Sequence, residues 1–361
     1  MKPIKLKFKK RTIILGKKTQ VFIFALLGVI ILTLVGYLIF GPTSNDKKTF
    51  NKTTKKTTKK EDPIKIIDLN SDSRPYAVMI NNNTAVWGYQ AGIQDAYLVY
   101  EMVVEGGITR MMAVFKDQET ARIASVRSSR HYFLDYALEN DAIYAHIGWS
   151  PQAQNDINKL NVNAINADNS KAFIWDRTLR IATEHRAYTS IQNLRDVAIK
   201  KGYRITSDEK PLLTYQVKSL DLSAAGDAIV ANTVRIPYSK SHLTSYSYNP
   251  ETKMYQRFQN DKPHTDYVTK AQYMTKNIIT YKLHNYPLND GSGKDRQGLN
   301  NIGSGDGYYI SEGYAIAITW EKTGRGSKTI YKVASTGKEL VVNDGNTFIE
   351  IEPDIQTLTI E

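Results

Sequence analysis

The chain has 361 residues, 41% of them apolar, which is enough for the core of one large domain or two ordinary ones. Its formal net charge is +12, but residues 1–60 hold fifteen of the 48 Lys and Arg residues and only one of the 36 acids. The rest of the chain is therefore nearly neutral, and we expect no nucleic-acid partner, because nucleic-acid binders concentrate positive charge on a folded face. The absence of cysteine excludes disulfides, cysteine-ligated zinc and a lipid-modified N-terminal cysteine.

An uncharged apolar run, residues 21–40, follows the basic residues 1–20. At ~1.5 Å per residue, a helix of this length spans a ~30 Å hydrocarbon layer. The run is longer than the apolar region of a cleaved signal peptide and its exit is bulky, which favours an uncleaved transmembrane anchor. The positive flank predicts a cytoplasmic tail of residues 1–20, a single-pass anchor in the cell membrane and an extracellular C-terminal region.

Residues 41–63 are rich in Lys and Thr and have too few apolar side chains to form a core, which predicts a disordered stalk. A basic stalk suits an anionic wall polymer, and a solvated spacer is an equally good interpretation. Beyond it, the pattern predicts an α+β protein with a mixed α/β first lobe, residues 64–210, and a mostly β second lobe, residues 227–361.

Short apolar or alternating runs predict the strands of both lobes, and amphipathic runs predict the helices. In the first lobe we expect strands at 74–81, 98–104, 108–115, 122–126 and 142–147, an extended stretch at 173–176, and helices at 131–139, 151–160 and 190–201. In the second lobe we expect strands at 228–238, 255–259, 277–284, 314–320, 329–334 and 347–352, interrupted by a Gly-rich flexible surface loop at 289–307.

A Gly pair separates two strands of the first lobe and predicts a tight hairpin. Gly106 and Gly107 allow the positive φ that a two-residue turn requires. With these two residues as the turn, strand alternation places Glu101, Glu105 and Arg110 on one face of the hairpin. The other face is mostly apolar and should belong to the core.

The most suggestive local motif is Arg127-Ser128-Ser129-Arg130, at a predicted strand-to-helix junction. Either serine is a suitable N-cap, and a helix N-terminus offers free N–H groups and the positive end of its dipole. Two guanidinium groups beside it can hold a phosphate or carboxylate bidentately. Ion pairs between the two arginines and the acids of the hairpin are the alternative interpretation.

Two histidines are further candidates. His146 ends an apolar strand, and His185 lies in a loop with Arg180, Glu184 and Arg186. A lone histidine is more often structural than catalytic, and no spacing supports a metal pair, so we expect neither a metal nor a cofactor. The standard signatures of serine hydrolases, zinc proteases and phosphate loops do not occur in the sequence.

Longer stretches allow a comparison with known families. In the first lobe they are RPYAVMINNN, AGIQDAYLVYEMVVEGGITRMMAVF, ARIASVRSSRHYFLDYALENDAIYAHIGWSP and AFIWDRTLRIATEHRAYTS, and in the second YQRFQNDKPHTD, KNIIT, GYAIAITWEK and GNTFIEIEP. They resemble the YerB-like family of bacterial surface proteins, whose domain is of unknown function, across about residues 64–361. The resemblance implies a two-part ectodomain on the outer face of the membrane.

This chain departs from the family pattern in three places. It lacks the lipobox cysteine of many relatives and has a predicted helix instead. It has Ala124-Ser125 where relatives tend to have Gly-Pro, and Glu184-His185-Arg186 where Pro-His-Asn is usual. The polar motif positions that the resemblance implies are Glu101, Glu105, Arg110, Arg127, Ser128, Arg130, His146, Arg177 and His185.

We expect five side chains to converge on one cleft of the first lobe, with Glu105 at its rim: Arg127, Arg130, His146, Arg177 and His185. Glu101, Arg110 and Ser128 are further candidate ligand-binding residues. The favoured function is binding of an anionic cell-envelope polymer or glycan. The first alternative is a hydrolase or lyase for an envelope glycan or phosphodiester, with Glu105, His146 and His185 as catalytic groups. The second is a scaffold for membrane-protein partners.

Overall fold

The computed structural model describes four ranges of the chain, residues 4–8, 11–15, 65–167 and 171–361. The predicted transmembrane segment, 21–40, and the predicted stalk, 41–63, lie outside the described residues. Within the four described ranges, no helix is both long and apolar enough to cross a bilayer.

The chain divides into two compact units, Met1–Lys59 and Lys60–Glu361. In the first unit, the strands β1 (Ile4–Phe8) and β2 (Arg11–Leu15) pair antiparallel. They lie in the predicted basic tail, where the sequence had suggested no strand. The remaining elements belong to the second unit.

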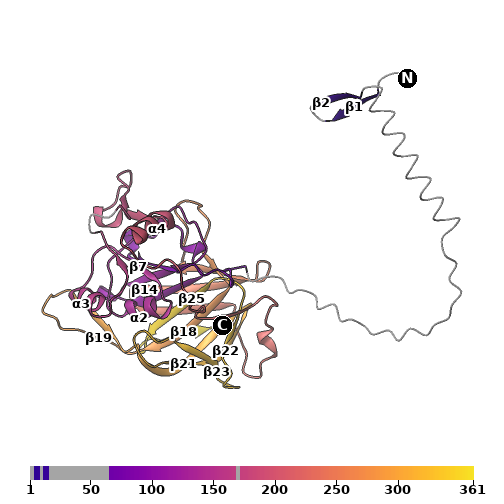
Figure 1. The fold of residues 1–361 in the computed structure, drawn as a ribbon. Coiled ribbons are helices and arrows are strands. Elements are labelled where there is room, and N and C mark those ends of the chain that lie inside the picture. Colours follow the sequence, from indigo (N-terminus) through magenta and orange to yellow (C-terminus); the bar gives the residue numbers. More distant parts are fainter. Residues whose placement is uncertain (1–3, 9–10, 16–64, 168–170) are drawn as a thin grey trace. The chain divides into compact units, whose positions relative to one another are not determined.

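A mixed sheet of eleven strands forms the centre of the second unit. Its strands are β3 (Tyr76–Asn81), β4 (Leu98–Val103), β5 (Thr109–Phe115), β7 (Ile143–Ala145), β8 (Ala164–Ile165), β12 (Ile229–Val230), β18 (Asn277–Leu283), β21 (Gly303–Ser311), β22 (Tyr314–Lys322), β23 (Ile330–Val333) and β25 (Thr347–Pro353). Their order is β12-β22-β21-β18-β25-β4-β5-β3-β7-β8, with β23 on β22. The parallel pairing of β25 with β4 joins the two predicted lobes in one sheet (Figure 1).

A second sheet packs on the large one. It consists of β13 (Thr233–Ser239), β14 (His242–Asn249), β15 (Met254–Gln259), β16 (Lys262–Pro263), β17 (Met274–Thr275) and β26 (Thr359–Ile360). The order is β16-β15-β14-β13-β26, with β17 on β15. Buried and half-buried residues alternate strictly along β13 and β15, as expected for strands with one face on a core. We call this the six-stranded sheet.

Smaller elements complete the unit. They are the helices α2 (Phe133–Glu139), α3 (Pro151–Lys159) and α4 (Ile191–Lys200), the 3-10 turns Thr84–Val86, Ile93–Asp95, Glu105–Gly107, Thr183–His185 and Leu222–Ala224, and the short strands β6 (Ile123–Ala124), β9 (Ile174–Trp175), β10 (Ala187–Thr189), β11 (Thr214–Gln216), β19 (Asn285–Pro287), β20 (Gln297–Leu299) and β24 (Val341–Asn343). Ser150 caps α3 and Ser190 caps α4, each with its hydroxyl accepting a backbone N–H. The three helices lie with the N-terminal, purple strands (Figure 1).

The prediction of a mixed α/β first part and a β second part is confirmed. Two local predictions are wrong. The strand β14 was missed, because its inward residues include His242 and Thr244, which read as loop residues. The stretch 289–307 is not one flexible loop, since it contains β20 and the first half of β21.

The register of the β4–β5 hairpin differs from the prediction by one residue. Both glycines have positive φ, 67° at Gly106 and 69° at Gly107, as expected. The loop, however, has three residues, Glu105–Gly107, because the Val104 N–H donates to the Ile108 carbonyl at 2.8 Å. A shift of one residue exchanges the faces of a strand.

The consequence of this shift is that the predicted polar face does not exist. Glu101 lies opposite Met111, and Met102 lies opposite Arg110. Glu101 and Arg110 therefore point to opposite sides of the sheet. Both strands are buried along their whole length, so neither face is exposed to solvent.

Candidate functional site

Three arginines surround one glutamate where the β4–β5 loop meets residues 127–130. The Arg130 Nε donates to one oxygen of Glu105, and the Arg110 Nη2 lies 3.7 Å from the other. Arg110 also donates from Nη1 to the Ser128 carbonyl at 2.7 Å. Arg127 is close enough to influence both other arginines electrostatically. We call Glu105, Arg110, Arg127 and Arg130 the arginine cluster.

The backbone of residues 127–130 is extended and held on both sides. The Arg127 N–H donates to the Met79 carbonyl at 3.0 Å, and the Ser129 N–H donates to the Gly148 carbonyl at 3.0 Å. Helix α2 begins only at Phe133, and its N-cap makes no side-chain hydrogen bond. The predicted capping role of Ser128 or Ser129 is therefore wrong, and the arginines themselves supply the positive charge of the cluster.

The charges of the arginine cluster do not balance. Burial and repulsion from Arg130 lower the pKa of Arg110 to about 9, and burial also lowers the pKa of Arg127. Burial alone would raise the pKa of Glu105, but the hydrogen bond and charge of Arg130 and the charge of Arg110 leave it below its ordinary value. Glu105 is thus ionised at neutral pH. The carboxylates of Glu105 and of the exposed Glu184, beside Arg127, act on three guanidinium groups, so one positive charge is left over.

One donor of the cluster has no acceptor. Arg110 is only 7% exposed, and its Nε is buried without a hydrogen-bond partner among the described residues. A buried donor without an acceptor is costly, so the cluster as described is incomplete. An anion beside the arginines would supply both an acceptor and the negative charge.

His185 borders the cluster next to Arg127. The Arg127 Nη1 donates to the carbonyl of the adjacent Glu184 at 3.0 Å. The His185 Nδ1 lies 2.9 Å from the side-chain amide of Asn81, which is a donor, so Nδ1 accepts. Burial and the charge of Arg127 lower the pKa of His185, and the ring is therefore neutral at pH 7.

His146 lies behind the cluster, not at its surface. Its side chain is 0% exposed, and its ring packs 5.1 Å from the ring of Tyr144 and 5.6 Å from that of Trp149. Its Nδ1 lies 2.9 Å from the Gly148 carbonyl, so Nδ1 carries the proton. The Tyr144 hydroxyl in turn donates to the Ser129 hydroxyl at 2.9 Å, which links the His146 ring contact to residues 127–130. Trp149 itself is 37% exposed.

Two predicted site residues lie elsewhere. Arg177 is exposed in the loop after β9 and makes no hydrogen bond or ion pair with the described residues. Glu101 faces the six-stranded sheet. The structure thus brings Glu105, Arg110, Arg127, Ser128 and Arg130 together, with His185 beside them and His146 behind, whereas Glu101 and Arg177 are not part of this group.

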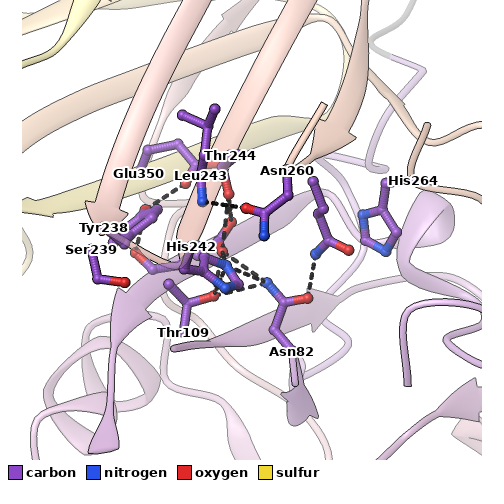
Figure 2. A network of polar contacts seen from close by, with 12 residues as sticks. Asn82, Thr109, Tyr238, Ser239, His242, Leu243, Thr244, Asn260, His264 and Glu350 are labelled. Atoms are coloured by element: carbon purple, nitrogen blue, oxygen red, sulfur yellow. Dashed lines mark hydrogen bonds and ion pairs between the residues drawn. The ribbon is translucent and has the colours of Figure 1, made fainter. Parts of the chain in front are cut away.

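Glu101 belongs to a second polar centre between the two sheets. Figure 2 shows part of this centre, including Asn82, His242 and Glu350. We call it the buried network; its members are Asn82, Gln90, Glu101, Thr109, Tyr238, His242, Thr244, Tyr246, Arg257, Gln259, His264 and Glu350. All of its side chains are at least nine-tenths buried.

The central pair of the buried network is Glu101 with Arg257. The Arg257 Nη2 donates to Glu101, which also accepts from Asn82 at 2.9 Å and from Thr244 at 3.2 Å. Burial would raise the pKa of Glu101, but Arg257 and His242 hold it well below its ordinary value. One carboxylate and one guanidinium therefore neutralise each other inside the protein.

The second carboxyl of this network, Glu350, is in a different state. Burial and the charge of Glu101 raise the pKa of Glu350 to about 8, so it is mostly protonated at neutral pH. The Tyr238 hydroxyl lies 2.6 Å from Glu350 and 3.1 Å from the Glu101 carbonyl, and Tyr246 donates to the other oxygen of Glu350. Burial and Arg257 keep the pKa of His264 well below its ordinary value.

The alternation of residues along β15 is the sequence signal for this network. Tyr255, Arg257 and Gln259 alternate along β15, so all three point to the same buried face. An arginine in phase with a core tyrosine predicts a buried partner of opposite charge. Across the described ranges, no group of three or more His, Asp or Glu side chains is arranged to hold a metal ion.

Comparison with known proteins identifies the family. The model of the DUF3048 N-terminal domain matches residues 65–204, and that of the DUF3048 C-terminal domain matches residues 234–349. Over 293 residues the chain is 27% identical to YerB of Bacillus subtilis (strain 168), a protein described by inference as a lipoprotein, covering 80% of this chain and 84% of that one.

A solved structure agrees with this result. The crystal structure of YerB from Bacillus subtilis matches with a TM-score of 0.69 and 26% identity, covering 81% of this chain and 94% of the other. The resemblance to YerB-like proteins is thus confirmed. The chain belongs to the DUF3048 family, whose two domains are both described as being of unknown function.

Proposed function

We propose that this chain is a membrane-anchored protein of the cell surface that binds an anionic group of an envelope polymer or glycan at the arginine cluster. The observation that carries the proposal is the buried Arg110 Nε, which has no acceptor among the described residues, in a cluster where three arginines exceed the carboxylates of Glu105 and the exposed Glu184 by one charge. A phosphate or carboxylate would balance both. The exposed Trp149 next to His146 adds an aromatic surface nearby.

The proposed membrane anchor is supported by observations outside the arginine cluster. The relative YerB is described as a lipoprotein, whereas this chain has no cysteine to carry a lipid. Residues 21–40 would serve as the anchor instead, with the basic tail inside the cell. Protease added to intact cells should then digest the region after residue 64 and leave a short membrane-bound fragment. Protection of that region would contradict the orientation.

A hydrolytic function of the same residues has less support. Glu105 is engaged by two arginines, and its lowered pKa leaves it without a proton to give as a general acid at neutral pH. His146 is fully buried. His185 is partly open, but its Nδ1 accepts from Asn81 and the neutral ring carries its proton on Nε2, so it has no free lone pair for a general base, and no described contact joins it to Glu105.

Binding can be tested by sedimentation with purified bacterial cell walls, using the full-length protein in lipid nanodiscs. The expected result is retention on walls with their phosphate polymers, loss of retention as salt rises, and at least about tenfold weaker retention of Arg130→Gln. Walls stripped of phosphate polymers by acid distinguish a phosphate ligand from a glycan carboxylate.

The matched control for this experiment is Arg235→Gln. The Arg235 side chain is 41% exposed on the six-stranded sheet, where it pairs with Asp261 at 2.8 Å, so the variant removes the same charge at another place. The basic stalk is present in every variant and contributes equally. Equal retention of the Arg130 and Arg235 variants, or no retention of the wild type, would contradict the proposal.

A further inference from the structure

A cavity far from the arginine cluster contains a carboxyl group that is only half satisfied. It has a volume of about 400 Å³, within the range of small-molecule sites. Its lining comes from β18, β21, β22, β25 and the segment before β26, and includes Thr280, Tyr308, Ala317, Glu352 and Leu358. Every one of these residues lies outside the arginine cluster and the buried network.

Glu352 is the polar centre of this cavity. It is 1% exposed, and its Oε1 accepts from the Thr280 hydroxyl, whereas its Oε2 is buried with no hydrogen-bond partner among the described residues. Glu350, two residues earlier on the same face of β25, has a tyrosine hydroxyl at each oxygen. The free acceptor of Glu352 is therefore a feature of the cavity rather than of buried carboxyls in this sheet.

The surroundings of Glu352 favour a positively charged donor. The lining side chains next to it are largely apolar, and an ionised carboxylate there gains most from a charged hydrogen-bond donor. Of the two charged side chains that also line the cavity, Lys282 is exposed and donates to the Gln356 carbonyl at 2.6 Å, and Asp306 is exposed and negative. When Glu352 is ionised, two acids and one lysine leave the cavity with an excess of negative charge.

We propose that this cavity binds a small amine with an apolar body, whose ammonium group donates to the free Oε2 of Glu352. The apolar body would lie against Tyr308, Ala317 and Leu358. This site is independent of the arginine cluster, because it takes a ligand of opposite charge on another part of the large sheet. Failure of one proposal therefore leaves the other intact.

The proposal can be tested by calorimetric titration of the full-length protein in phosphatidylcholine nanodiscs, with empty nanodiscs as the blank. The probes are 4-phenylbutylamine and its neutral counterpart 4-phenyl-1-butanol, which differ in the head group alone. The wild type should prefer the amine by at least about tenfold, as expected for a charge-assisted hydrogen bond. Glu352→Gln keeps the shape and should bring the two affinities within about twofold.

Two further variants make the test specific. Ala317→Phe should fill the cavity and weaken both probes, which shows that they bind there. Glu321→Gln removes an exposed carboxylate from β22 that does not line the cavity, and it should leave the amine preference unchanged. Melting curves of all variants report whether they are folded.

Acidity provides a second readout. Burial raises the pKa of Glu352 to about 7, so the ionised form that the amine needs is lost as pH falls. The other groups that face it are the Thr280 hydroxyl, the exposed Lys282 and Asp306, and no charged residue of β22. Amine affinity should fall about tenfold between pH 8 and pH 6 in the wild type and stay constant in Glu352→Gln.

The proposal is overturned by equal affinities of the wild type for the two probes, by an amine preference that survives in folded Glu352→Gln, or by no detectable binding of either probe at 10 mM.

Discussion

The arginine cluster and the buried network both consist of arginines and glutamates, yet their charges are arranged in opposite ways. In the buried network, Arg257 faces Glu101, and the second carboxyl, Glu350, stays mostly protonated. In the cluster, the half-buried Glu105 pairs with Arg110 and Arg130, and the third arginine, Arg127, has the exposed Glu184 beside it, so the arginines exceed the acids by one. Charges that a folded protein buries completely are paired or neutralised, because an unpaired buried charge is costly. An excess charge at a partly open position therefore indicates that a ligand of opposite charge binds there.

The largest expected effect separates the two regions by stability. Arg257→Met leaves Glu101 charged and unpaired inside the protein, which should lower the free energy of unfolding by about 3–5 kcal/mol. The matched change in the cluster, Arg130→Met, leaves Glu105 beside Arg110 and relieves repulsion between the arginines, so it should cost less, about 1–2 kcal/mol. Guanidinium denaturation followed by tryptophan fluorescence measures both, and similar losses would show that the two regions are alike.

The next prediction concerns pH. The pKa of Glu350 rises from an ordinary 4.5 to about 8 in the folded protein. The folded state therefore keeps a proton that the unfolded state loses, so stability should fall as pH rises from about 5 to 8 and level off above. The slope from one group is at most about 1.4 kcal/mol per pH unit.

Glu350→Gln isolates this contribution, since it removes the titrating group but keeps its shape. Denaturation curves at several pH values should show a smaller fall in stability between pH 5 and 8 for the variant than for the wild type. An unchanged pH profile would mean that Glu350 is ionised in the folded protein. The buried network would then carry two carboxylates opposite Arg257 instead of one.

A smaller effect is expected at the loop that connects the two regions. Gly107 has φ of 69°, and a Cβ placed there would lie 3.0 Å from the Ser239 Cβ of the six-stranded sheet. Gly106 has φ of 67° but nothing within 4 Å. Gly107→Ala should therefore cost about 1–2 kcal/mol and Gly106→Ala about half as much, because only the first adds a steric conflict to the strained φ. Equal losses of unfolding free energy in denaturation experiments would show that Ser239 moves aside without a measurable loss of stability.

The smallest expected effect is at Arg177. Because its side chain is exposed and makes no hydrogen bond or ion pair with the described residues, Arg177→Gln should change neither the melting temperature nor wall retention measurably. A clear loss of retention would place Arg177 in the ligand site after all and widen the cluster.

The two regions differ in how much of their structure the sequence could predict. The glycine pair predicted the hairpin, because positive φ is a local property of Gly106 and Gly107. The register depended on whether Glu105 belongs to the strand or the loop, and local pattern does not decide this. The one-residue error moved Glu101 to the wrong face and hid its pairing with Arg257, 156 residues away.

The arginine cluster was easier to predict because it comes from two short stretches of sequence. Arg127 and Arg130 belong to one motif, and Glu105 and Arg110 belong to one hairpin. The location of Arg177 and the depth of His146 depend on how loops pack over the sheet. Such contacts are set by tertiary structure and leave no periodic pattern in the sequence.

The most direct test of the central claim is the melting temperature of the full-length protein with and without tripolyphosphate. An anion held by the arginine cluster stabilises the folded state, whereas one attracted to the basic stalk does not. The account predicts a rise in the melting temperature of the wild type that is lost in Arg130→Gln and kept in Arg235→Gln. No rise in the wild type, or an equal rise in both variants, would contradict it.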